Sequence, residues 1–116
     1  MKKYILSLVI IAVTAFGMSA RQLKVLAIGN SFSEDALEQE MHDLTIAGGD
    51  EIVIGNLYFP GCSIERHYNN MKGDNGEYSY RKIAADGRVD TIAACTISRA
   101  LADEEWDYIT FQQASH

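Results

Sequence analysis

Apolar and polar positions along the chain fall into blocks whose periods predict alternating strands and helices. Leu23–Ile28 is a nearly continuous apolar run with β-branched residues, as expected of a strand buried on both faces of a parallel sheet. Glu51–Tyr58 forms the next such run. The intervening segment, Glu34–Ala47, repeats its apolar positions at helical spacing and ends at Gly48-Gly49. Strand, helix and strand within about 35 residues predict a βαβ unit.

The predicted helix between these strands has one apolar stripe, formed by Leu37, Met41 and Leu44. We therefore expect it to pack on the sheet through a single face. The residues expected to face water are Glu38, Glu40 and Asp43.

The next part of the chain predicts a shorter helix and a hairpin. After a Pro-Gly turn, Ser63 is suited to cap a short helix that runs toward Met71. Two strand-like runs, Tyr78–Ala84 and Arg88–Ala93, flank Asp86-Gly87, which is a strong hairpin signal because both turn positions would take positive φ. We expect this hairpin to be a small antiparallel appendage.

The last predicted elements are a short helix and a third parallel strand. Ile97–Glu104 is the helix, with Thr96 as its cap, and Trp106–Gln112 is the strand. Polar residues follow this strand end. The prediction is an α/β fold, with a parallel sheet of which about three strands are present and a small β-hairpin, and in such sheets reactive groups collect at the carboxyl ends of the strands.

Ser31 stands at the carboxyl end of the first predicted strand, directly before the helix. Ser31 and Glu34 fit the S-x-x-E capping box, in which two side chains satisfy orphan N–H groups of a new helix, and Ser33 could cap instead. The alternative is a nucleophilic Ser31, because a strand end and a positive helix N-terminus converge there. The local pattern alone favours capping.

Residues 1–20 have the order of a secretory signal peptide. Lys2 and Lys3 form the basic start, an apolar run follows, and Ser19-Ala20 supply small residues before a cut. We expect export to the periplasm or the extracellular space, with the mature domain at residues 21–116. An uncleaved membrane anchor is the alternative, although the apolar run is short for a membrane span.

The charge balance argues against two classes of partner. The 116-residue chain has a formal net charge of −6. Without Lys2 and Lys3, 8 basic residues remain against 16 acidic ones, so the mature part carries −8. Nucleic acids and anionic membranes both attract clustered Lys and Arg. We therefore expect neither nucleic acid nor, after signal cleavage, a membrane as partner.

Cys62 and Cys95 are the two cysteines of the chain. Export would permit a disulfide, but the favoured interpretation is that both are small, buried, free thiols. No CxxC, HxxxH or HExxH spacing occurs, so we expect no metal site and no cofactor.

Three segments of the chain match the signature blocks of one superfamily. They are Ile28-Gly-Asn-Ser-Phe-Ser33, the Pro60-Gly-Cys-Ser63 turn and Trp106–Ser115. Together they resemble the SGNH (GDSL-like) hydrolase superfamily, and more closely an exported bacterial branch of it described only as a domain of unknown function. The resemblance spans essentially the whole mature chain. It implies a flavodoxin-like three-layer sandwich and serine esterase activity.

The resemblance also implies roles for particular residues. Ser31 matches the nucleophile, and its backbone N–H would be one oxyanion donor; Gly61 matches the glycine whose N–H is another. Such preorganised donors stabilise the charge that develops in acyl transfer. Asn30 stands where the wider family has Asp, and Gln112-Gln113 where Gly-x-Asn-Asp is expected. The third donor would then be the side-chain amide of Gln113 or a residue beyond position 116.

The Asp-x-x-His block, which carries the general base of that superfamily, has no counterpart in the chain. A serine hydroxyl is a weak nucleophile until a base takes its proton. We expect His42 to be solvated in mid-helix, His67 to lie near the crevice and His116 to be terminal, and a surface or packing role is favoured for each. The chain is therefore expected to be the first half of a longer enzyme.

The leading functional prediction is a serine esterase that removes small acyl groups, such as acetyl, from an extracytoplasmic carbohydrate or similar ester. The alternative is a non-catalytic glycan-binding or accessory domain on the same scaffold, and downstream sequence with Asp-x-x-His distinguishes the two. A third class would bind phosphate or nucleotide at the turn of residues 29–33. That turn lacks both a P-loop lysine and a G-x-G-x-x-G pattern, so this class ranks last.

Overall fold

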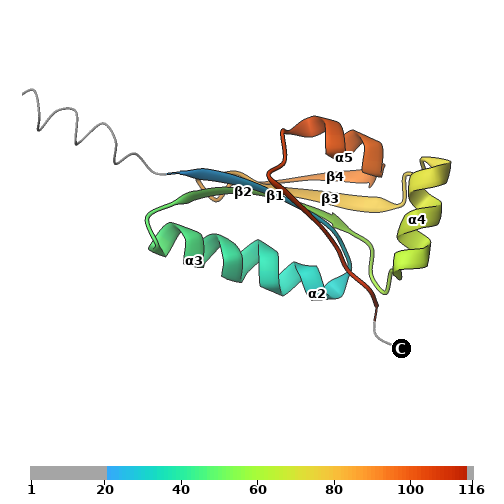
Figure 1. Cartoon of the computed structure of the whole chain (residues 1–116), viewed down its shortest axis with the longest axis horizontal. Coiled ribbons are helices and arrows are strands. Elements are labelled where there is room, and N and C mark those ends of the chain that lie inside the picture. Colours follow the sequence, from blue (N-terminus) through green and yellow to red (C-terminus); the bar gives the residue numbers. More distant parts are fainter. Residues whose placement is uncertain (1–20, 115–116) are drawn as a thin grey trace, which may run out of the picture.

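The computed structural model describes residues 21–114 as a five-stranded sheet with helices on both faces (Figure 1). The strands are β1 (Gln22–Gly29), β2 (Glu51–Tyr58), β3 (Tyr78–Ile83), β4 (Val89–Cys95) and β5 (Tyr108–Phe111). The helices are α2 (Ser31–Ser33), η1 (Glu34–Met41), α3 (His42–Ala47), α4 (Ile64–Gly73) and α5 (Ile97–Asp103), of which the first three follow one another directly. The predicted leader and His116 lie outside the described residues. Within residues 21–114, no helix is long and apolar enough to cross a membrane.

The strand order is β4-β3-β2-β1-β5. β1 pairs in parallel with β2 on one side and with β5 on the other, which confirms the predicted α/β fold with three parallel strands. β3 pairs antiparallel with both β2 and β4, so the sheet is mixed, and the prediction of a separate hairpin appendage is wrong. The hairpin extends the sheet because β3 satisfies backbone groups of β2 that would otherwise form an exposed edge. This pairing also buries Tyr80 and Ile83.

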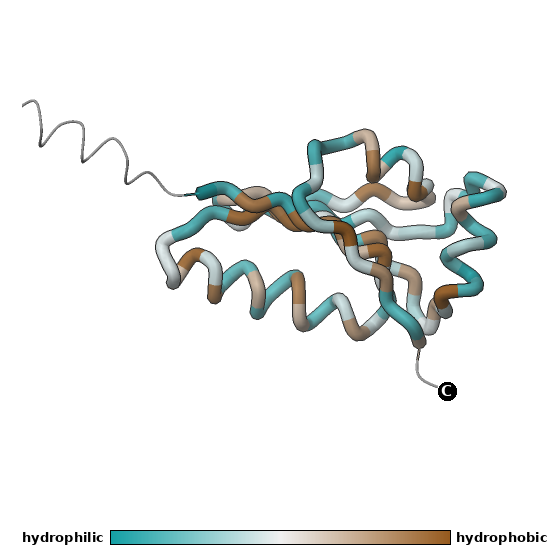
Figure 2. The backbone as a smooth tube through the Cα atoms, viewed as in Figure 1, coloured by the Kyte–Doolittle hydropathy of each residue, from teal (hydrophilic) through white to brown (hydrophobic). Residues whose placement is uncertain are grey.

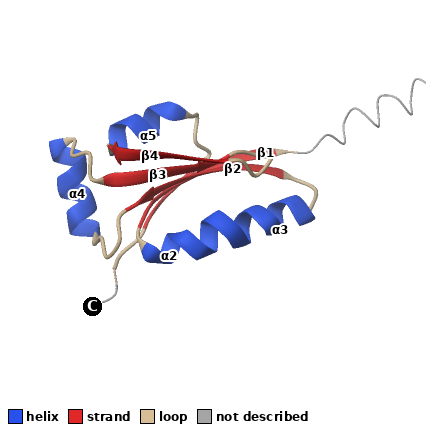
Figure 3. Ribbon diagram, turned by 180° about the vertical axis from the view of Figure 1, so that it is seen from behind, coloured by secondary structure: helices blue, strands red, loops and turns tan. Residues whose placement is uncertain are grey.

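The core lies on both sides of β1. Leu26 and Ile28 belong to one apolar cluster and Val25 and Ala27 to the other, as the continuous apolar run of this strand predicts. The helix of residues 31–47 covers one face of the sheet and α5 covers the opposite face, as seen from behind in Figure 3. Figure 2 shows the hydrophobic residues concentrated along the strands between these layers. The helical members of the two clusters are Leu37 from η1 and Ile97 and Ala100 from α5.

Two of the predicted helix caps are present. The Ser63 hydroxyl accepts a hydrogen bond from the Arg66 N–H at 3.2 Å, and the Thr96 hydroxyl accepts one from the Arg99 N–H at 3.2 Å. Each satisfies one of the orphan N–H groups in the first turn of α4 or α5. The starts of both helices are therefore set by their local sequence.

The hairpin turn differs in type from the predicted one. Within Asp86-Gly87 only Gly87 has a positive φ, of 88°. The Gly87 N–H donates to the Ala84 carbonyl at 2.9 Å, and the Ala84 N–H donates to the Arg88 carbonyl at 2.9 Å. This is the pattern of a three-residue loop that ends in a left-handed glycine, so one position needs the left-handed conformation rather than two.

The helix of residues 31–47 is wound more widely than an α-helix over the eight residues of η1, which form a π-helix. Of the predicted apolar stripe only Leu37 is buried, because Met41 is 36% exposed and Leu44 is 70% exposed. The stripe was inferred from the 3.6-residue period, which does not apply to π-helical turns. The expected outward position of Glu38 is also wrong, since its carboxylate is held against the sheet.

A row of hydrogen bonds joins this helix to the sheet. The Ser33 hydroxyl lies 3.0 Å from Asn56 Oδ1, and Asn56 Nδ2 donates to Glu38 Oε1 at 2.7 Å. Arg81 on β3 donates to the same Glu38 oxygen at 3.2 Å and to Glu34 at 2.9 Å. Asn56 is fully buried, and both ends of its amide are bonded. The row therefore fixes the first turns of the helix, next to Ser31.

We expect the substitution Asn56→Asp to destabilise the chain by about 3 kcal/mol at pH 7, because it places a second carboxylate against Glu38 in a buried position. Burial and the neighbouring carboxylate would raise the pKa of the new group above its unfolded-state value. The loss of stability should therefore be full above that raised pKa and should shrink as the pH falls through it. Urea unfolding at pH 7 and pH 5 measures both effects.

Asn69→Asp is the matched control, since Asn69 is exposed on α4. It makes the same chemical change and should alter the free energy of unfolding by less than about 0.5 kcal/mol. Equal losses for the two variants would contradict the role given to the buried row.

Candidate active site

Asn30 caps the helix that follows β1, in place of the serines that the sequence favours. Its Oδ1 accepts a hydrogen bond from the Phe32 N–H at 3.1 Å, and its backbone is extended, with φ −141°. The capping box of Ser31 with Glu34 is therefore wrong, and so is a cap by Ser33. The helix begins at Ser31, which is one residue earlier than a cap by Ser31 requires and three earlier than a cap by Ser33 requires, and Asn is among the preferred N-cap residues.

The two serines after Asn30 lie in opposite environments. Ser31 is exposed, and its hydroxyl makes no hydrogen bond to another residue of the described chain. Ser33 is fully buried, with its hydroxyl 2.8 Å from the Asn30 carbonyl oxygen and 3.0 Å from Asn56 Oδ1. A Cβ at Gly29 would lie 2.7 Å from the Cβ of Ser33, so this close approach requires glycine. Of the two hydroxyls only that of Ser31 is accessible to a substrate.

Gly61 lies in the turn that connects β2 to α4, with φ +69°, a conformation that favours glycine. The Cys62 N–H closes this turn by donating to the Phe59 carbonyl at 3.2 Å. Asn30 Nδ2 donates to the Cys62 carbonyl at 3.1 Å, so the Gly61 turn is tied directly to the end of β1. The end of β2 therefore lies beside the start of the helix that carries Ser31.

Gln112 and Gln113 follow β5 at the same edge of the sheet. The Gln112 N–H donates to the Ile28 carbonyl at 3.1 Å, and its carbonyl oxygen lies 3.5 Å from Asn30 Nδ2. Gln113 Oε1 accepts from the Ile64 N–H at 2.6 Å, which leaves the amide NH2 as the unbound end of this side chain among the described residues. The structure thus brings together the three segments that carry Ser31, Gly61 and Gln113.

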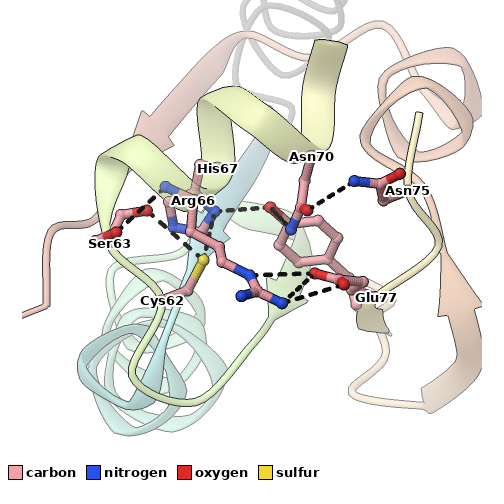
Figure 4. A network of polar contacts seen from close by, with 8 residues as sticks. Cys62, Ser63, Arg66, His67, Asn70, Asn75 and Glu77 are labelled. Carbon is pink, nitrogen blue, oxygen red and sulfur yellow. Dashed lines mark hydrogen bonds and ion pairs between the residues drawn. The ribbon is translucent and has the colours of Figure 1, made fainter. Parts of the chain in front are cut away.

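His67 is buried beneath α4 in a polar cluster rather than exposed at the strand ends (Figure 4). Its Nδ1 lies 2.8 Å from the Tyr78 hydroxyl and 3.3 Å from Cys62 Sγ. Asn70 Nδ2 donates to the Tyr78 hydroxyl at 3.3 Å, and His67 Nε2 is buried without a hydrogen-bond partner among residues 21–114. The cluster holds α4 against β3.

The cluster is neutral at pH 7. Burial lowers the pKa of His67, and the backbone of Gln112 opposes this only in part. Burial raises the pKa of Tyr78 to about 12 and also raises the pKa of the Cys62 thiol. A neutral imidazole whose Nδ1 is already bonded to Tyr78 is poorly placed to take a proton from Ser31. Its role in the structure is to position α4.

The other two histidines contribute no base among the described residues. His42 was expected to be solvated, but its side chain is only 14% exposed, and its Nε2 is buried without a hydrogen-bond partner among residues 21–114. The prediction fails because His42 lies against the hairpin turn, where a Cβ at Gly87 would be 3.6 Å from its ring. His116 lies outside the described residues.

Sequence reasoning missed the function of Asn30 in holding the three segments together. The available signal was an Asn placed directly after a buried strand and before a helix, where an amide side chain is a preferred cap. What the sequence could not supply was the position of the Cys62 and Gln112 carbonyl groups, which are 32 and 82 residues away along the chain.

Both cysteines are buried and free. Burial raises the pKa of each thiol, which lowers the fraction of reactive thiolate at neutral pH. We therefore expect Cys62 and Cys95 in the folded chain to react with a thiol reagent such as Ellman's reagent more than about tenfold more slowly than in guanidinium chloride at pH 7.5. Rapid reaction of one thiol without denaturant would contradict its buried position.

Comparisons with known proteins identify relatives of the chain. A family model described as "Domain of unknown function (DUF4886)" matches residues 24–116. The crystal structure of a DUF4886 family protein from Bacteroides uniformis ATCC 8492 is similar to this chain, with 52% sequence identity and a TM-score of 0.77. The match covers 80% of this chain and 36% of that chain. No curated protein matches.

The chain thus spans about a third of the length of the solved relative. The family model, in contrast, matches nearly all of the described residues, including the three segments that meet at the carboxyl edge of the sheet. The chain belongs to the DUF4886 family.

Proposed function

We propose that this chain is the nucleophile-bearing part of an exported SGNH-type serine esterase with a flavodoxin-like sandwich fold, in which Ser31 is the residue that is acylated. The observation that carries the proposal is the exposed hydroxyl of Ser31, which is unbonded among residues 21–114 and lies at a strand end to which two further segments are tied. Ser33 and Ser63 are each engaged in structural hydrogen bonds. Of these three serines, Ser31 is the one that is free to react.

The backbone around Ser31 supplies donors for a developing negative charge. The N–H groups of Ser31 and Gly61 donate no hydrogen bond to any residue of the described chain. Ser31 also begins a helix, where the unpaired N–H groups carry partial positive charge. With the free NH2 of Gln113, these groups form the proposed oxyanion site. Removing one such donor from a serine hydrolase typically costs about 10²–10³-fold in kcat.

The general base of the proposed enzyme lies outside the described residues. His67 is bonded to Tyr78 and neutral, and His42 is held against the hairpin. We propose that the base and its orienting carboxylate come from an Asp-x-x-His block in sequence that follows position 116. The greater length of the solved relative leaves room for such a block.

The proposed substrate is a small acyl ester, such as an acetyl group on an extracytoplasmic carbohydrate. This assignment rests on the resemblance to SGNH hydrolases, and a leader peptide and an acidic mature chain are compatible with it. The competing proposal is a glycan-binding or accessory domain without catalysis, which would retain the fold and not react at Ser31.

A fluorophosphonate probe should label the protein at Ser31 when it is produced with its natural downstream sequence. Ser31→Ala should abolish the labelling, because among the serines of residues 21–114 at this edge only Ser31 has a hydroxyl that is both exposed and unbonded. Ser63→Ala is the control and should keep it, since that hydroxyl only caps α4. Peptide mass spectrometry identifies the labelled residue. Labelling that survives Ser31→Ala would place the nucleophile elsewhere, and no labelling at all would favour the binding domain.

The 116-residue chain alone should hydrolyse p-nitrophenyl acetate at least about 10²–10⁴-fold more slowly than the longer protein, because it lacks the general base. Both rates should be measured on protein shown by circular dichroism to be folded. If the short chain reaches an ordinary enzymatic rate, the base lies within it, and the turnover of His67→Ala and of His116→Ala would then show which of the two histidines acts.

A further inference from the structure

We propose that Asn30 is a positioning residue that holds the three parts of the oxyanion site in register through its side-chain amide. The structural part of this inference concerns hydrogen bonds that are independent of any reaction. Its catalytic part rests on the proposed function. The two parts are tested by different measurements.

Both the oxygen and the nitrogen of the Asn30 side-chain amide have hydrogen-bond partners. Oδ1 accepts from the Phe32 N–H at 3.1 Å, and Nδ2 reaches the carbonyl oxygens of Cys62 at 3.1 Å and Gln112 at 3.5 Å. The amide has two N–H donors, so it can serve both carbonyl groups at once. The residue is only 1% exposed, so water does not compete for these bonds.

Each of these contacts lies next to a proposed site residue in the sequence. Asn30 precedes Ser31, the Cys62 carbonyl follows Gly61, and the Gln112 carbonyl precedes Gln113. One side chain therefore controls the separation of all three proposed donors.

The segments also form a closed circuit of bonds. From Asn30 the circuit runs to Cys62, along the backbone to Ile64, across to the side chain of Gln113 at 2.6 Å, and through Gln112 back to Asn30. Neither Gly61 nor Gln113 belongs to a helix or strand that would hold it in place by itself. Their positions depend on this circuit.

In this chain the circuit depends on an amide, and the Asp that the wider superfamily has at this position could not make it. A carboxylate at position 30 could still accept from the Phe32 N–H, but it has no proton to donate and would oppose two carbonyl oxygens. A serine could still cap the helix, but its short side chain would lose both ties. The substitutions Asn30→Asp and Asn30→Ser thus separate the capping function of Asn30 from its positioning function.

Steady-state hydrolysis of p-nitrophenyl acetate by the longer protein tests the catalytic part. We expect Asn30→Ser and Asn30→Asp to lower kcat by about 10²-fold at pH 7.5 with KM changed less than about threefold, because a displaced oxyanion donor affects the transition state more than substrate binding. Asn69→Asp is the charge-matched control and should retain wild-type kinetics.

The pH dependence provides a readout that a purely structural function would not change. Burial beside two carbonyl groups raises the pKa of the carboxyl in Asn30→Asp, and the protonated acid can donate one hydrogen bond again. The ratio of the kcat of Asn30→Asp to that of wild type should therefore rise at least about fivefold as the pH falls from 8 to 5.5. The same ratio for Asn30→Ser should stay constant. If both variants keep wild-type kcat, or if the loss only follows the fraction of unfolded protein, the catalytic part is wrong.

Amide hydrogen exchange in the same proteins tests the structural part without turnover. The amides to follow are the hydrogen-bonded N–H groups of Cys62 and Ile64, which belong to the circuit. In both Asn30 variants their exchange should become at least about tenfold faster, while exchange in β3 should match wild type. Asn69→Asp should match wild type throughout. Unchanged exchange at Cys62 and Ile64 would overturn the inference. If the wild-type protein shows neither turnover nor labelling at Ser31, but exchange is still faster in the Asn30 variants, the structural part is supported and the esterase proposal fails.

Discussion

Parallel pairing of β1 with both β2 and β5 is the constraint on which the site depends. Parallel strands end at the same edge of a sheet, so the segments after these three strands must meet. The three strands stay paired up to their last residues, because Gly29 lies opposite Tyr58 and Ile28 lies opposite Phe111. Burial of both faces of β1 holds the register, because a slip of one residue would exchange Leu26 and Ala27 between the two apolar clusters.

Some features that neighbouring residues determine were predicted correctly, although the cap by Asn30 and the type of the hairpin turn were not. The continuous apolar run of β1 and the caps by Ser63 and Thr96 depend on neighbouring residues. The docking of β3 on β2 and the inward position of Glu38 depend on groups elsewhere in the chain. Hydrophobic periodicity contains no information about such partners, and it assumes a helix of regular pitch.

The same division applies to the candidate site. Ser31, Gly61 and Gln113 were selected by sequence, and the structure places their segments at one edge. The choice of Ser31 as the nucleophile came from the resemblance, because the local pattern gives Ser31 and Ser33 alike the composition of a cap. Burial makes the distinction, since Ser33 packs against Gly29 and Asn56 while Ser31 remains open to solvent.

The π-helical turns of η1 affect how the length of this segment can vary. Each such turn holds more residues than an α-helical turn, so deleting one residue between Glu34 and Met41 would let the segment shorten toward regular geometry. In a helix of fixed pitch, a deletion rotates everything on one side by about 100°, whereas here the tightening of a wide turn takes up the missing residue. The turns on either side of the deletion would therefore keep their faces toward the sheet, where Leu37 and Glu38 have their partners. Relatives that share the sheet should thus be able to differ by one residue in this segment.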